Sequence, residues 1–298
     1  MDYRLLLYFT TLIDQGSFTK AAKALYISQP SLSTAIKQFE EDMGIVCIKR
    51  STRKISVTKE GEILYIEAKK LLNHTEHVKN EMIRLRDNGP LELQIGVIES
   101  IIFWLPKVLS AYRQDHPSMQ IKLHELLGVE EVERALQNYH IHLAITNQHF
   151  ESKDIATTPI YKENLVTVLP NRHPLQHHKY VTMEDLQHDN LIISKEGFQT
   201  REDILNEFRK SGITPNVQFE IERFETACSL VKEGLGITIA PENYMKTWDR
   251  PSFIIKPLKN DYLSRTVYLA FLKNRYLPPS VEHFMERIQL HFKLHMDI

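Results

Sequence analysis

The sequence has few of the features that secreted, membrane-spanning or metal-binding proteins share. Its 298 residues include 2 cysteines, Cys47 and Cys228, which lie far apart and match no disulfide or metal-ligand spacing. No run of about 18 consecutive apolar residues occurs. The opening segment MDYRLLLYF lacks the small-residue cleavage site of a signal peptide. We therefore expect a protein of the reducing cytoplasm with no membrane segment.

Sequence motifs of catalysis are missing as well. The chain contains no GxSxG, HExxH or GxxxxGKS/T motif. His173, His177 and His178 lie in one short run, but adjacent histidines cannot easily share one metal ion. The glycines within 234–236 do not lie between a strand and a helix, as a dinucleotide loop requires. We expect no catalytic residue, no metal and no cofactor.

The charge is nearly balanced overall, at −1, but it is unevenly distributed. The first 60 residues contain nine Lys or Arg and six Asp or Glu, which leaves this head at +3 and the remainder at −4. A basic head on an acidic body indicates an anionic partner for the head.

Three short helices are predicted in the basic head. Apolar spacing predicts helices over 3–15 and 18–25, and a third helix that Ser28 caps. Pro30 falls in the first turn of the third helix, where its missing N–H costs little. This helix has one apolar stripe, which consists of Leu32, Ile36, Phe39 and Met43.

The face opposite this stripe carries short polar side chains and one lysine. Such a face lets a helix lie deep in the major groove of DNA, where Ser, Thr and Gln bond base edges or phosphates. Two short helices and a tight turn form a helix-turn-helix, here over about 18–37. The alternative is a three-helix cap whose polar face meets water. The face contains Gln29, Pro30, Ser31, Ser33, Thr34, Lys37 and Gln38.

A two-stranded ribbon is predicted over 46–58, because apolar and polar residues alternate on both sides of a basic tip. A basic tip beside a groove-binding helix suits contacts to phosphates or to the minor groove. The alternative is a solvated surface turn. The tip contains Arg50, Ser51, Thr52, Arg53 and Lys54.

A single long helix is predicted over 59–87, with apolar residues spaced alternately by four and three. A seam this narrow predicts pairing with the same helix of a second chain. Such a dimer would place two DNA-binding heads on two half-sites. The seam contains Leu64, Ala68, Leu71, Thr75, Val78, Met82 and Leu85.

The remainder, 91–298, alternates predicted strands and helices, which favours a mainly parallel sheet covered by helices. In such sheets, ligands bind at the carboxyl ends of strands beside helix N-termini. Each polar candidate could instead serve as a helix cap. The candidates are Ser100, Ile101, Thr146, Ser194, Phe198, Gln199, Thr200 and Thr226.

The charges near this predicted cleft bear on the ligand. Glu99 would disfavour a strongly anionic ligand if it points inward, and the residues after Ser100 are unusually apolar. No arginine is expected at a pocket position, although Arg201 and Arg223 lie nearby. We expect a small carboxylate with an apolar part.

The head resembles the DNA-binding domain of LysR-type transcriptional regulators over residues 1–61. The resemblance is carried by GSFTKAAKAL, SQPSLS, FEEDMG and SVTKEG, with apolar departures at Phe39 and at Cys47-Ile48 and a further departure at Glu60. It implies that the polar face of the third helix contacts the major groove. It also implies that Arg50 and Arg53 serve the wing or its packing.

The resemblance implies an α/β protein that binds double-stranded promoter DNA and a small-molecule co-inducer of unknown identity. It also implies a homodimer and a homotetramer built as a dimer of dimers. The alternative is a non-catalytic small-molecule-binding protein whose head is a structural cap. The expected parts are an all-α winged helix-turn-helix domain (1–58), a dimerising linker helix (59–88) and an effector domain of periplasmic-binding-protein type (91–298). The effector domain is expected to have two lobes. Lobe I would contain 91–161 and 266–298, and lobe II would contain 162–265.

Overall fold

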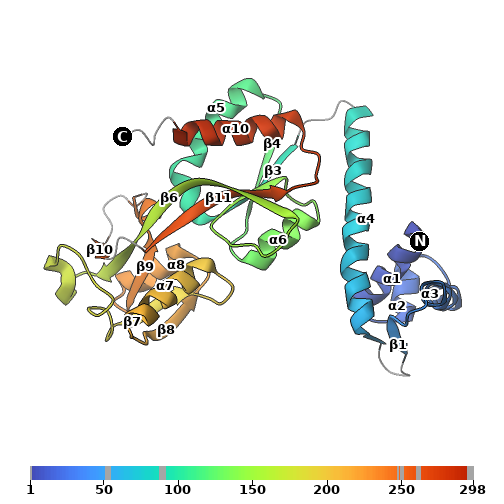
Figure 1. Cartoon of the computed structure of the whole chain (residues 1–298), viewed down its shortest axis with the longest axis horizontal. Coiled ribbons are helices and arrows are strands. Elements are labelled where there is room, and N and C mark those ends of the chain that lie inside the picture. Colours follow the sequence, from blue (N-terminus) through green and yellow to red (C-terminus); the bar gives the residue numbers. More distant parts are fainter. Residues whose placement is uncertain are drawn as a thin grey trace. The chain divides into compact units, whose positions relative to one another are not determined.

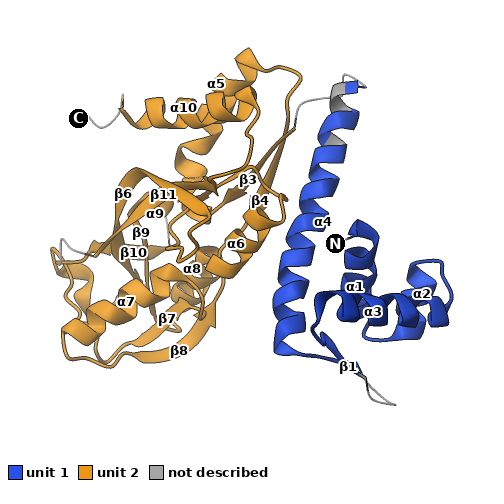
Figure 2. Ribbon diagram, turned by 45° about the vertical axis from the view of Figure 1, so that its right-hand side comes forward, with its two compact units in different colours: residues 1–89 blue, residues 90–298 orange. Residues whose placement is uncertain are grey.

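The computed structural model describes residues 2–50, 55–86, 92–246, 248, 252–259 and 263–293. The chain forms two compact units, Met1–Gly89 and Pro90–Ile298 (Figures 1 and 2). Each unit has its own hydrophobic core.

The first unit is a winged helix-turn-helix followed by a long helix, as predicted. Its elements are α1 (Tyr3–Gln15), α2 (Phe18–Ala24), α3 (Gln29–Met43), β1 (Ile48–Arg50), β2 (Ile55–Val57) and α4 (Lys59–Arg86). Gly16 ends α1 in the left-handed region at φ 61°, and the Ser28 hydroxyl accepts a hydrogen bond from the Ser31 amide to begin α3. Tyr26, in the turn between α2 and α3, also has a positive φ of 55°.

The core of the first unit holds α3 in place. Leu32, Ile36 and Phe39 are at most 2% exposed, and the rings of Phe9 and Phe39 lie 6.0 Å apart. Burying the whole apolar stripe of α3 in this core leaves the opposite face of the helix in solvent.

The heptad prediction for α4 is wrong at its first two positions. Leu64 and Ala68 are buried in the core of their own unit, together with the neighbouring Leu72. The three-helix head is too small to close its core alone, so the first half of α4 completes it. Farther along, Leu71 and Met82 are 52% and 56% exposed.

The junction between the ribbon and α4 is closely packed around Gly61. The hydroxyl of Thr58 donates to the Val46 carbonyl at 2.8 Å and accepts from the Gly61 amide at 3.0 Å. A β-carbon at Gly61 would lie 2.3 Å from the carbonyl oxygen of Cys47 and 2.8 Å from a methyl group of Val57. The close approach of helix and ribbon therefore requires glycine.

The second unit is a mixed sheet with helices on both faces (Figure 1). In its described residues the sheet has nine strands in the order β4-β3-β5-β11-β6-β9-β7-β8, with β10 paired to β6. The strands are β3 (Glu92–Val97), β4 (Gln120–Glu125), β5 (Leu143–Thr146), β6 (Ile155–Pro170), β7 (Asn190–Ser194), β8 (Asn216–Ile221), β9 (Ile237–Pro241), β10 (Phe253–Pro257) and β11 (Ser264–Leu272). The helices are η1 (Glu99–Phe103), α5 (Leu105–Asp115), α6 (Val129–Gln137), η2 (Pro174–His177), α7 (Gln199–Lys210), α8 (Phe224–Lys232), α9 (Glu242–Met245) and α10 (Pro279–Lys293).

Two long antiparallel strands, β6 and β11, run through the middle of this sheet (Figure 1). The lobe bounds expected from the sequence place a change of lobe between residues 161 and 162. β6 is one continuous strand of 16 residues that pairs with β11 up to Asn164 and with β9 and β10 from Leu165 onward. Glu163 on β6 lies directly opposite Arg265 on β11. Both lobes therefore share a pair of hydrogen-bonded strands, which limits their relative motion to bending and twisting of that pair.

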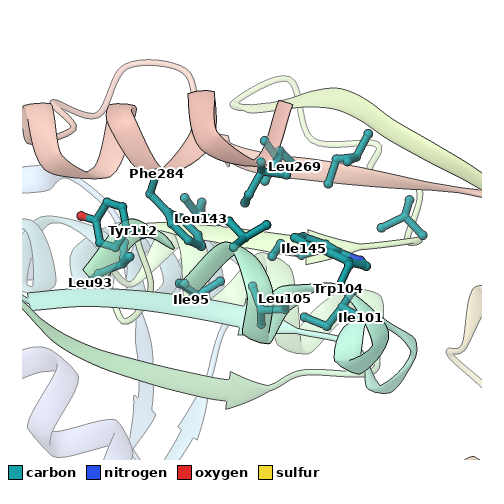
Figure 3. Packing of buried hydrophobic residues seen from close by; sticks show 14 of the residues in the cluster. Leu93, Ile95, Ile101, Trp104, Leu105, Tyr112, Leu143, Ile145, Leu269 and Phe284 are labelled. Carbon is teal, nitrogen blue, oxygen red and sulfur yellow. The ribbon is translucent and has the colours of Figure 1, made fainter. Parts of the chain in front are cut away.

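Apolar clusters lie on either side of these shared strands. The largest cluster packs α5 and α10 on the sheet through Trp104, Tyr112 and Phe284, each at most 1% exposed (Figure 3). Another packs α7 on the sheet through Ile204 and Phe208. Among the described residues, the structure contains no helix long and apolar enough to cross a membrane.

Gly61→Ala should destabilise the first unit by roughly 1–3 kcal/mol, because the added methyl group meets the Cys47 backbone and a methyl group of Val57. Thermal unfolding followed by circular dichroism measures the loss. The control is Glu62→Ala, an exposed neighbour on the same helix. Equal unfolding temperatures for the two variants would contradict the close packing of α4 on the ribbon.

Candidate functional site

The exposed face of α3 contains the residues predicted to contact DNA. Gln29, Pro30, Ser31, Thr34 and Lys37 are exposed, and Ser33 is half-buried. Lys37 is the cation of this group, and its ammonium lies 3.4 Å from the carboxylate of Glu41 one turn later. The face is otherwise neutral and made of short side chains.

The ribbon is held against α3 by one buried carboxylate. Glu40, 9% exposed, accepts hydrogen bonds from the amides of Cys47 and Ile48 at 2.8 and 2.9 Å. These contacts tie the start of β1 to the last turn of α3, so the wing and the helix keep one relative position. The side chain of Arg50 and all of Arg53 and Lys54 lie outside the described residues.

A narrow cavity lies between residues of the two lobes, where the sequence predicts a ligand cleft. Its volume is about 20 Å³, which is room for one water molecule. Its lining contains Ile98, Glu99, Ser100, Leu127, Asn147, Gln148, Ser194, Phe198, Thr200, Glu222, Phe224 and Arg265.

Arg265 occupies the centre of this site. Its guanidinium donates to Glu163 Oε1 through Nε at 2.8 Å, to Ser100 Oγ at 2.6 Å and to Thr200 Oγ1 at 2.9 Å. Glu163 and Arg265 are 3% and 6% exposed. Ser100 follows β3 in lobe I and Thr200 begins α7 in lobe II, so the guanidinium links both lobes.

Sequence reasoning missed this arginine and its carboxylate partner. We had expected no arginine in the pocket, and that expectation is wrong. A signal was available in the strand pattern, because Arg265 shares one face of β11 with Val267 and Leu269, both fully buried. In the same way, Glu163 shares one face of β6 with the buried residues Leu165 and Tyr161.

Half of the predicted ligand residues line the cavity, namely Ser100, Ser194, Phe198 and Thr200. Thr146 is buried beside it, and its hydroxyl accepts from the Gln148 amide at 3.1 Å. The cavity is lined there by the next two residues, Asn147 and Gln148.

The other three predicted ligand residues lie elsewhere. Ile101 is 2% exposed in the core of lobe I, beside Trp104 (Figure 3), because the short helix η1 turns it inward. The side-chain amide of Gln199 donates a hydrogen bond to the carboxylate of Asp203 at 2.9 Å along α7. Thr226 is exposed, because α8 begins two residues earlier than expected, at Phe224.

Four contacts between the lobes close the cleft. Glu99 accepts from the Phe224 amide at the start of α8 at 3.0 Å, and Arg223 pairs with Glu125. Asn147 donates to Thr200 Oγ1 at 3.2 Å, and the amide of residue 129 donates to the carbonyl of residue 197 at 3.4 Å. A ligand larger than water has to break some of these contacts to enter.

Glu99 lines the cleft without a cationic partner among the described residues, whereas Glu163 and Glu222 each have one. Burial raises its pKa above the usual range, while the hydrogen bond from the Phe224 amide acts against that shift and nearby Glu125 adds to it. The positive charges of Arg223 and Arg265 also lower the pKa of Glu99.

Neither cysteine has the exposed, acidic thiol of a reactive cysteine. Cys47 and Cys228 are both free and buried. Burial raises the pKa of both thiols, that of Cys228 to about 12, so neither forms a thiolate readily.

Comparison with known proteins assigns both units. Residues 3–62 match the family described as "Bacterial regulatory helix-turn-helix protein, lysR family", and residues 88–293 match "LysR substrate binding domain". The transcriptional regulator BenM of Acinetobacter baylyi is 31% identical over 248 residues, or 81% of this chain and 80% of BenM. The regulator YybE of Bacillus subtilis is 28% identical and covers 98% of this chain and 99% of its own.

Solved structures have the same overall fold. Full-length BenM has a TM-score of 0.61 at 27% identity, covering 99% of this chain and 98% of that one. CbnR in complex with its target DNA has a TM-score of 0.69 at 21% identity, covering 97% and 99%. Together, the two units define a DNA-binding transcriptional regulator with an effector-binding domain. The chain belongs to the LysR family.

Arg265→Met and Glu163→Leu should each destabilise the second unit by about 3–5 kcal/mol, because each leaves the other charge buried and unpaired. The double variant should lose much less than the sum. Denaturant unfolding of the four proteins measures this coupling. Additive losses would mean that the two side chains do not depend on each other.

Proposed function

We propose that this regulator binds promoter DNA as an oligomer and that a small molecule in the interlobe cleft changes how it binds. The observation that carries the proposal is the exposed face of α3, which is short, polar and fixed by a buried stripe on the other side. Side chains of this kind reach base edges without holding the helix away from the groove.

The proposed DNA contacts come from α3 and the wing. Residues of α3 enter the major groove, and the wing lies along phosphates or in the minor groove. The contacting residues would be Gln29, Pro30, Ser31, Ser33, Thr34, Lys37, Arg50, Arg53 and Lys54. Because the chromosome is the target, the protein acts in the cytoplasm.

The exposed part of α4 supports a dimer. Leu71, Val78 and Met82 lie along one side of the helix, and all three are at least 45% exposed. Exposed apolar residues repeated at heptad spacing favour pairing with a second helix. Two dimers would then join into a tetramer through further contacts.

The cleft supports the effector role. The proposed effector is a small carboxylate with an apolar part, which enters beside Ser100, Ser194, Phe198 and Thr200. The cavity volume of about 20 Å³ is too small for such an effector, so an effector would favour a more open arrangement of the lobes. This shift would alter the spacing of the DNA-binding heads in the oligomer.

The test of the proposal is a footprint of the purified full-length protein on the DNA that flanks its own gene, at two salt concentrations. We expect protection of an inverted repeat that weakens as salt rises. Absence of protection at low salt, also with small molecules from cell extract added, would favour a ligand-binding protein with a structural cap.

Lys37→Ala should weaken operator binding and reduce the slope of log affinity against log salt by about 1, because one cation near the phosphates is lost. Fluorescence anisotropy with labelled operator DNA measures both values. Lys107→Ala, an exposed lysine of the second unit, is the control. An unchanged slope for Lys37→Ala would remove this lysine from the DNA contact.

Leu71→Glu combined with Met82→Glu should convert the oligomer to a smaller species, because carboxylates cannot be buried in a helix seam without a partner. Light scattering after size-exclusion chromatography measures the mass. Glu76→Lys changes charge on a different side of α4 and should leave the mass unaltered. If the double glutamate variant keeps the parent mass, the seam is not the interface.

A further inference from the structure

The cleft contains one more carboxylate than it has cations. The charged residues that line the cavity in the described part of the chain are Glu99, Glu222 and Arg265. Arg265 pairs with Glu163, Glu222 pairs with Lys195, and Arg223, just before α8, pairs with Glu125. Glu99 lines the same cavity, yet it forms no ion pair with any residue in the described part of the chain. One negative charge is therefore left over at the cavity wall.

Water solvates this surplus charge less well than it solvates an exposed carboxylate. Glu99 is partly buried, and the amide of Phe224 satisfies one of its oxygens, Oε2. The positive charges of Arg223 and Arg265 act on Glu99, but each of these arginines is paired with another carboxylate. A carboxylate in this position gains most from a ligand that brings its own cation.

Another part of the cavity wall has hydrogen-bond donors. The guanidinium of Arg265 and the hydroxyls of Ser100 and Thr200 are joined in one network, with bonds of 2.6 and 2.9 Å. A ligand carboxylate can replace a hydroxyl as the acceptor for this guanidinium and can accept from the released hydroxyl as well. This wall therefore suits a ligand anion.

Apolar side chains complete the lining of the cavity. Ile98, Phe198 and Phe224 line it, and the ring of Phe224 is 9% exposed. Their surfaces suit a hydrocarbon group of the ligand. The cleft thus offers an anion for a cation, donors for an anion and an apolar surface within one cavity.

Resting on the effector role proposed above, we infer that the effector is a free α-amino acid with an apolar side chain. Its ammonium group pairs with Glu99, its carboxylate binds Arg265 with Ser100 and Thr200, and its side chain lies against Phe198 and Phe224. A carboxylate without the ammonium group leaves Glu99 uncompensated in the cleft, so it binds less tightly.

The experiment uses full-length protein, isothermal titration calorimetry and two matched series of probes. L-leucine is compared with isocaproate, which lacks the ammonium group, and with isoamylamine, which lacks the carboxylate. L-phenylalanine is compared with phenylpropionate and phenethylamine. We expect at least one of the two amino acids to bind, with a loss of about tenfold or more for each of its analogues, as is typical for a charged hydrogen bond.

Glu99→Gln provides the decisive variant, because it keeps the size and the acceptor but removes the charge. The preference of the parent protein for the amino acid over its des-amino analogue should fall from about tenfold toward equality. Glu151→Gln, an exposed glutamate on a loop, is the matched control and should keep the full preference.

Three results would overturn the inference: equal binding of the amino acid and its des-amino analogue, no binding of either amino acid, or an unchanged preference in Glu99→Gln. The operator footprint is measured on the same preparation without ligand. A normal footprint beside any of these results rejects the amino acid and keeps the regulator, whereas a missing footprint rejects the proposed function itself.

Discussion

The buried ion pair between Glu163 and Arg265 is the constraint on which the second unit depends. The two residues lie opposite each other on β6 and β11, the strands that both lobes share. Burying two charges costs free energy unless every polar atom finds a partner. Ser100 and Thr200, one from each lobe, accept hydrogen bonds from two further N–H groups of the guanidinium. Glu163 Oε2 is buried without a hydrogen-bond partner among the described residues. In this arrangement Arg265 is hydrogen-bonded to residues of both lobes.

A pair placed in this way connects ligand binding to lobe movement. Any effector that takes a place in the arginine network changes how strongly Ser100 and Thr200 hold the two lobes together. The remaining contacts, between Glu99 and the start of α8 and between Arg223 and Glu125, break in the same opening. Under the proposed function, an exchange of hydrogen bonds at Arg265 would change the angle between the lobes.

The DNA-binding unit depends on a different constraint. The hydrophobic core of its three short helices is small, and residues of α4 are needed to complete it. The first half of α4 supplies Leu64 and Ala68 to that core, and Gly61 lets the helix approach the ribbon. Glu40 then fixes the wing to α3 through two backbone amides. As a result the helix that we propose to dimerise also completes the core that holds α3.

The sequence alone determined the helices of the head, the exposed polar face of α3 and the strand and helix order of the second unit, because local periodicity and caps encode them. It also located four cavity residues, since ligands gather at strand ends. It did not determine which side chains meet: Ile101 turned into the core, Thr226 into solvent, and Leu64 and Ala68 into their own unit. Arg265 and Glu163 are 102 residues apart, and no local pattern pairs them. Only the register of β6 with β11 brings them together, because burial forces each charge to find a partner across the sheet.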